Sequence, residues 1–122
     1  MPKQSDVLAA DFLVKIAEEF GTPVYIYHAE KIKTQYEKLQ KAFHKTDTRF
    51  FYACKALTNI NILKYVNSLG CGLDTVSIQE VQLGLKAGFD PKNIIFTPNC
   101  VDLQEIIAAK NLGVIINIDN LS

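Results

Sequence analysis

The 122-residue sequence has no tryptophan, no surplus of either charge and no long apolar run. Its 13 Lys and Arg residues balance 13 Asp and Glu residues, whereas a nucleic-acid-binding protein needs excess cations to displace counterions from phosphates. No stretch approaches the roughly 20 apolar residues of a membrane span, and the N-terminus has no signal-peptide core. We therefore expect neither nucleic acid nor a membrane as a partner.

Cysteine pairs and the common nucleotide and hydrolase motifs are also missing. Cys54, Cys71 and Cys100 are odd in number and form no C-x-x-C pair, so we expect reduced thiols in a cytoplasmic protein, without a disulfide frame or a metal site. The sequence has no G-x-G-x-x-G, P-loop or G-x-S-x-G motif, which weakens the dinucleotide, nucleotide triphosphate and hydrolase interpretations.

What is present begins with two amphipathic segments. Apolar residues at helical spacing predict helices over about 11–20 and 29–43. Between them, the turn residues of 21–23 precede a β-rich run, Val24–Tyr27, which we expect to be a short strand.

From residue 49 onward the pattern alternates between strands and helices. Strands recur roughly every 20 to 23 residues, each followed by a loop and an amphipathic helix, which predicts βαβ units and a parallel sheet. The expected strands are 49–54, 72–76, 93–97 and 114–118, and the expected helices are 61–69, 78–87 and 102–112. Such a set makes either about half of an eight-stranded barrel or a small open sheet of flavodoxin-like size.

Lys55 is the one cation in an otherwise apolar stretch at the end of the first of these strands. Burial would make its amine easier to deprotonate and therefore nucleophilic, and the carboxyl end of a parallel strand is the active-site side of an α/β fold. The alternative is that Lys55 extends from the strand end to a surface carboxylate.

Two carboxylates follow on the next unit. Asp74 lies inside a strand, where it would either pair with Lys55 or accept from turn amides. Glu80 ends a Ser77-x-x-Glu80 sequence whose spacing is typical of a helix capping box, although it could also point toward the strand ends. His28 and His44 are isolated, and we take both as structural or exposed.

The ordered set of these residues resembles the front of the fold-type III pyridoxal-phosphate decarboxylases. The resemblance covers nearly the whole chain from about residue 12. Within the family, the sequence is most similar to the members that convert meso-diaminopimelate to L-lysine. The segments that carry it are Phe20–Tyr27, Tyr52–Ala56, Gly72–Asp74 with Ser77 and Glu80, Leu85–Phe89, Ile94–Thr97 and Ile118–Asp119.

The resemblance implies an α/β fold of parallel βα repeats, roughly the first half of a (β/α)8 barrel over 29–122. It implies that residues 1–28 carry a helix and a strand that belongs to a separate β domain. Lys55 would bind the aldehyde of pyridoxal phosphate covalently, and Asp74 and Glu80 would lie near that lysine and help to set its charge.

The resemblance also implies an activity for the whole enzyme. The substrate would be a small amino acid, meso-diaminopimelate, and the full-length protein would be a homodimer. This chain would be an N-terminal fragment that is inactive alone. The alternatives are another decarboxylase of the same fold (for ornithine, arginine or carboxynorspermidine), a non-catalytic pyridoxal-phosphate carrier, and a self-contained flavodoxin-like regulatory domain.

Overall fold

A computed structural model describes residues 8–118 of the chain. These residues divide into two compact units, one ending at Ala42 and one beginning at Phe43, and each is described by itself. Asp119, the last residue of the resemblance, lies outside the described part.

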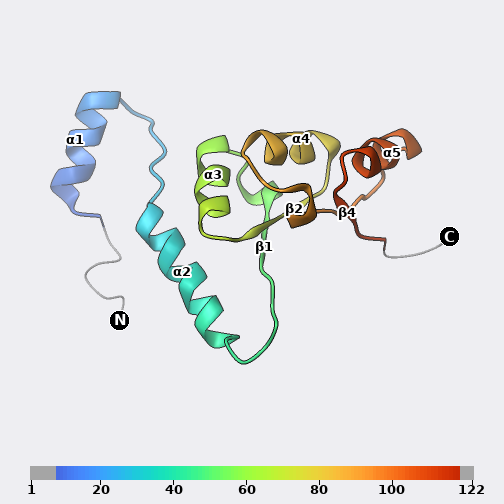
Figure 1. The fold of residues 1–122 in the computed structure, drawn as a ribbon. Helices are drawn as coiled ribbons and strands as arrows, with labels where there is room; N and C mark the ends of the chain where they lie inside the picture. The colour runs from blue at the N-terminus through green and yellow to red at the C-terminus, as the bar shows by residue number, and fades with distance from the viewer. Residues whose placement is uncertain (1–7, 119–122) are drawn as a thin grey trace. The chain divides into compact units, whose positions relative to one another are not determined.

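The first unit contains two helices, α1 (Ala10–Phe20) and α2 (Ala29–Ala42), as the apolar spacing predicts (Figure 1). Helix α1 ends at Phe20, and the backbone N–H of the following Gly21 donates to the carbonyl oxygen of Ala17. Gly21 adopts a φ of 80°, a backbone angle that residues other than glycine rarely adopt. None of the described residues of either helix is fully buried.

The prediction of a strand at Val24–Tyr27 is not met by the structure. The segment has no strand assignment and no sheet partner among the described residues, and Tyr25 is 86% exposed. Apolar and aromatic residues favour a strand only where a neighbouring strand completes the ladder. The assignment of residues 1–28 to a separate β domain stays a prediction.

The second unit is a run of βα repeats, with α4 and α5 lying beside the strands in Figure 1. Every predicted helix and strand from residue 49 onward is found, with each end within two residues of its predicted position. The elements are β1 (Phe51–Ala53), η2 (Cys54–Ala56), α3 (Ile60–Ser68), β2 (Gly72–Thr75), α4 (Ile78–Lys86), η3 (Pro91–Asn93), β3 (Ile94–Phe96), α5 (Leu103–Asn111) and β4 (Ile115–Ile116).

The four strands form one parallel sheet in the order β1-β2-β3-β4. Each strand therefore pairs with the next one in sequence, which is the order of an arc of a (β/α)8 barrel. A flavodoxin-like sheet instead reverses direction, in the order 2-1-3-4-5. The predicted class of parallel βα repeats of a barrel is confirmed, and the flavodoxin-like alternative is wrong.

Within the second unit, helices α3, α4 and α5 contact the strands, and successive right-handed crossovers in one direction place such helices on one face of the sheet. Alternate strand residues point to this covered face and form the core. Its largest fully buried members are Cys54, Leu63, Leu73, Thr75, Val81, Ile94 and Phe96.

Gly84 explains how closely α4 approaches the sheet. A Cβ at this position would lie 2.5 Å from Cδ2 of Leu73 and 3.2 Å from Cδ1 of Ile94. The missing side chain therefore lets the helix axis approach the side chains of β2 and β3. Among residues 8–118, no helix combines the length and the apolar character needed to cross a membrane.

Candidate functional site

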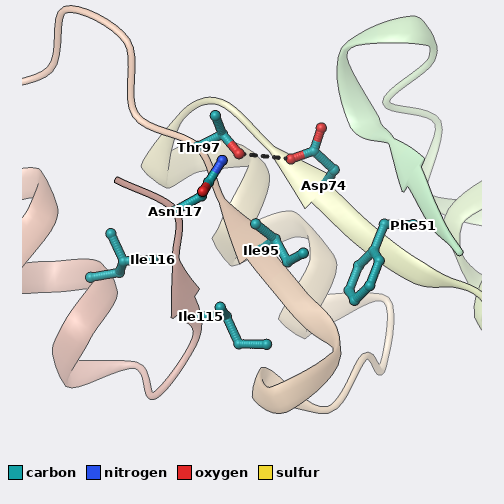
Figure 2. A pocket seen from close by; sticks show the side chains of 7 residues that line it. All are labelled: Phe51, Asp74, Ile95, Thr97, Ile115, Ile116 and Asn117. Carbon is teal, nitrogen blue, oxygen red and sulfur yellow. Dashed lines mark hydrogen bonds between the residues drawn. The ribbon is translucent and has the colours of Figure 1, made fainter. Parts of the chain in front are cut away.

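The opposite face of the sheet carries an open groove of about 520 Å³. Figure 2 shows the side chains that line it, which project from all four strands and from the residues that follow them. The lining residues are Phe51, Asp74, Ile95, Thr97, Ile115, Ile116 and Asn117. Apolar side chains form the floor, while polar side chains gather at the carboxyl ends of the strands, where α/β folds place their active sites.

Asp74 is the acidic residue of this groove. The pairing of β2 sets it beside Ala53 of β1 and Ile95 of β3, and it is half-buried. Its Oδ1 accepts a hydrogen bond of 3.0 Å from the hydroxyl of Thr97 (Figure 2). Among residues 8–118, Asp74 makes neither an ion pair with Lys55 nor a hydrogen bond to a turn amide, the two alternatives that the sequence leaves open. Its partner is the Thr97 hydroxyl, on the strand on its other side.

Glu80 lies in the first turn of α4, where the Ser77 side chain caps the helix. The Ser77 hydroxyl accepts from the backbone N–H of Glu80 at 3.2 Å, and Oε2 of Glu80 accepts from the backbone N–H of Val76 at 2.8 Å. The capping role that the spacing predicts is therefore confirmed, with the glutamate reaching one residue further back than in the usual box.

Lys55 lies in η2, the short turn that follows β1. Its side chain is exposed, and it makes no ion pair with a described residue. The expectation of a buried, dehydrated amine is wrong for residues 8–118. The physical reason is that the 3-10 turn takes the chain out of the sheet at residue 54, so the ammonium group keeps its water.

Charged groups affect the pKa of Cys54, the residue that precedes Lys55 in this turn. The thiol is buried, and burial together with the negative charges of Glu80 and Asp74 raises its pKa from 9.0 to about 11. Both carboxylates therefore act electrostatically on the residue before Lys55. Burial also raises the pKa of Cys71, and Cys100 is exposed.

Sequence reasoning did not single out Thr97 and Asn117 as members of the site. Both follow a strand by one residue and alternate onto the same face as Asp74. The sequence feature that could have identified them is a polar residue at the end of an apolar run. Thr97 comes two positions after Ile95, and Asn117 two positions after Ile115. His28 instead accepts from the backbone N–H of Lys31 at the start of α2, which is a structural role, and His44 is exposed.

The groove and the turn beside it have features that suit pyridoxal phosphate. The groove offers apolar side chains for a flat ring and the carboxylate of Asp74. The turn that follows β1 offers the exposed primary amine of Lys55. Among residues 8–118, no group of three or more His, Cys, Asp or Glu side chains could hold a metal ion.

The sequence matches the family described as "Pyridoxal-dependent decarboxylase, pyridoxal binding domain" over residues 29–122. A similar curated protein is the diaminopimelate decarboxylase of Methanothermobacter thermautotrophicus, with 41% identity over 111 residues, 89% of this chain and 26% of the relative. The diaminopimelate decarboxylase of Methanocaldococcus jannaschii is 34% identical over 116 residues. The chain thus spans about a quarter of the length of these curated relatives.

Solved structures of two decarboxylases resemble the fold of this chain. The diaminopimelate decarboxylase of Helicobacter pylori complexed with L-lysine matches with a TM-score of 0.82 and 33% identity, over 88% of this chain and 28% of that one. A lysine/ornithine decarboxylase of Vibrio vulnificus complexed with putrescine matches with a TM-score of 0.84 and 25% identity, over 94% of this chain and 32% of that one.

Proposed function

The chain belongs to the pyridoxal-dependent decarboxylases, as part of their pyridoxal-binding domain, and from this premise we propose that the whole protein decarboxylates meso-diaminopimelate to L-lysine. Pyridoxal phosphate is the cofactor of this family. The substrate assignment is supported by the curated relatives at 34–41% identity, which are diaminopimelate decarboxylases.

The observation that supports the proposal is the register of the sheet, which pairs Asp74 of β2 with Ala53, two residues before the exposed Lys55. In the proposal, the amine of Lys55 holds the cofactor covalently, and Asp74 and Glu80 set the charge around it. Bound pyridoxal phosphate supplies an electron sink for the loss of carbon dioxide.

The exposure of Lys55 fits a site that this chain builds only in part. In the proposal, the rest of the barrel faces the groove, supplies the ligands of the cofactor phosphate and the substrate carboxylate, and forms the homodimer. The 122-residue chain alone is then expected to show no turnover, because one arc of a barrel leaves the cofactor phosphate without its ligands.

A second substrate class has one supporting observation. The lysine/ornithine decarboxylase of Vibrio vulnificus shares the fold at a TM-score of 0.84, so ornithine or lysine could occupy the same groove. Its 25% identity is lower than the 41% of the diaminopimelate decarboxylase of Methanothermobacter thermautotrophicus, and we place it second.

The test uses the whole protein with bound cofactor. Carbon dioxide release is measured with meso-diaminopimelate, ornithine, lysine and arginine in parallel, and borohydride reduction followed by peptide mass spectrometry locates the modified lysine. Lys55→Ala should lower kcat by at least about a thousandfold, as removal of a covalent catalytic group does, and should abolish the labelled peptide.

Lys64→Ala is the matched control, because Lys64 is an exposed lysine on α3. It should retain both the label and the activity. Label on a lysine other than Lys55 would refute the role of this residue, and release from ornithine but not from diaminopimelate would favour the second substrate class.

A further inference from the structure

Asp74 has a neighbour on each adjacent strand at its carboxyl end. In the register of the sheet, Ala53, Asp74 and Ile95 lie side by side. Two residues after Ala53 and Ile95, beyond the ends of β1 and β3, come Lys55 and Thr97. The carboxylate therefore lies between the strand end that carries the amine and the strand end that carries a hydroxyl.

The hydroxyl occupies one oxygen of this carboxylate. Thr97 Oγ1 donates to Asp74 Oδ1 at 3.0 Å, and both side chains are half-buried. Figure 2 shows the other oxygen of Asp74 pointing away from Thr97. Among residues 8–118, Oδ2 has no hydrogen-bond partner, so it remains an acceptor at the rim of the groove.

The backbone fixes Thr97 in this position. Its N–H donates to the carbonyl oxygen of Thr75 at 2.8 Å, which extends the β2–β3 ladder by one residue beyond β3. A branched side chain on an extended, hydrogen-bonded backbone has few χ1 choices, so the hydroxyl is held in place before any ligand binds.

We propose that Thr97 is a positioning residue that holds Asp74 by Oδ1 and leaves Oδ2 presented to the amine and cofactor side of the groove. The inference rests on the proposed function, since it takes Asp74 to act beside Lys55. It adds the residue that follows β3 to a site whose other members come from η2, β2 and the first turn of α4. Hydrogen bonds to charged groups are the stronger ones in proteins, and they also fix orientation.

The experiment compares four variants of the whole protein: Thr97→Val, which keeps the branched shape without the hydroxyl, Thr97→Ser, which keeps the hydroxyl, Asp74→Ala, and the double variant Thr97→Val/Asp74→Ala. For each, kcat and KM are measured over a range of pH. Pyridoxal phosphate affinity is measured separately on cofactor-free protein by visible absorbance, without turnover.

Thr97→Val should lower kcat by about tenfold, the loss expected for one hydrogen bond to a charged group, and should weaken cofactor binding. Thr97→Ser should recover most of both. In the Asp74→Ala background, Thr97→Val should have no further effect on either, because positioning needs the carboxylate.

A matched control comes from the covered face of the same sheet. Thr75 Oγ1 donates to the carbonyl oxygen of Ile95 at 2.8 Å, and Thr75 is fully buried. Thr75→Val should lower the melting temperature without changing the shape of the pH profile. If Thr97→Val behaves in the same way, or its effect persists in the Asp74→Ala background, the positioning role is refuted.

The outcomes separate this inference from the proposed function. If Asp74→Ala lowers kcat strongly while Thr97→Val does not, Thr97 has no positioning role and the proposed function stands. If Asp74→Ala leaves both kcat and cofactor affinity unchanged, the proposed role of Asp74 fails, and the role of Thr97 fails with it.

Discussion

The two faces of the four-stranded sheet differ although their residues alternate along the same strands. On the covered face, Leu73 and Phe96 are fully buried under the helices. On the opposite face, Ile115 is 42% exposed and Asp74 is half-buried in an open groove. A one-residue step along β2 thus passes from the core to the candidate site.

The difference between the faces separates the residues that stabilise the fold from the residues of the candidate site. The covered face is apolar wherever a helix packs on it, and burial of such side chains supplies the main free energy of folding. The groove face combines apolar residues with Asp74 and Thr97 at the strand ends, which the packing of this unit does not require. Chemistry and stability therefore rest on alternate residues.

The largest difference between the two faces is expected in the free energy of unfolding when one side chain on each face is replaced by Ala. Phe96→Ala should lower the free energy of unfolding by about 3–5 kcal/mol, because it leaves a cavity in a close-packed core. Ile95→Ala, one residue away and half-exposed, should lower it by less than half as much. Urea unfolding of the 122-residue chain measures both.

The same pair of variants also tests what covers the groove. If the rest of the barrel faces it in the whole protein, the destabilisation by Ile95→Ala should increase there, toward the roughly 2–5 kcal/mol of a buried isoleucine. Equal effects in the short chain would mean that the two faces do not differ in packing.

Much of the covered face could be predicted from the sequence, and much of the groove could not. Helical spacing and strand length are local properties, so the βα repeats are found within a few residues of their predicted bounds. The exposure of Lys55 depends on the turn η2, and the engagement of Asp74 depends on a residue 23 positions later. These are properties of the turn and of strand register, which composition and periodicity do not report.

The Val24–Tyr27 segment makes the same point in the first unit. Its residues have high strand propensity, yet no described strand pairs with it. Propensity describes how well a residue suits a sheet, whereas a strand also needs a neighbour.

A second, smaller effect should appear in the pH dependence of stability. The pKa of Cys54 is raised from 9.0 to about 11 in the fold, first by burial and then by Glu80 and Asp74. An unfolded thiol ionises near pH 9 while the folded one stays neutral, so its contribution is fully present below pH 9. It is lost as the pH rises toward 11, by about 2–3 kcal/mol in total.

This effect is measured as the difference between the original chain and Cys54→Ala in urea unfolding at pH 7 to 11. The difference removes the contributions of Lys, Tyr and Cys71, which both proteins share. Cys100→Ala, at an exposed cysteine, should show no such change. A pH-independent difference for Cys54→Ala would mean that its thiol is not held neutral.

The smallest effect on stability is expected from removing the N-terminal caps of two helices, α4 and α5. Ser77 caps α4 and Asp102 caps α5, each by accepting the backbone N–H of a glutamate three residues later. Replacing either by Ala should lower the free energy of unfolding by about 1 kcal/mol. The two variants should therefore have similar melting temperatures.

Their activities should differ in the whole protein. Ser77→Ala loosens the turn that holds Glu80 against Val76, so kcat should fall several-fold, as when a supporting group moves a site residue slightly. Asp102 accepts from the backbone N–H of Glu105, which, unlike Glu80, does not affect the pKa of Cys54. Asp102→Ala should therefore leave kcat unchanged. Equal kcat values would show that Glu80 only caps its helix, and would leave Asp74 as the one acid acting on Lys55.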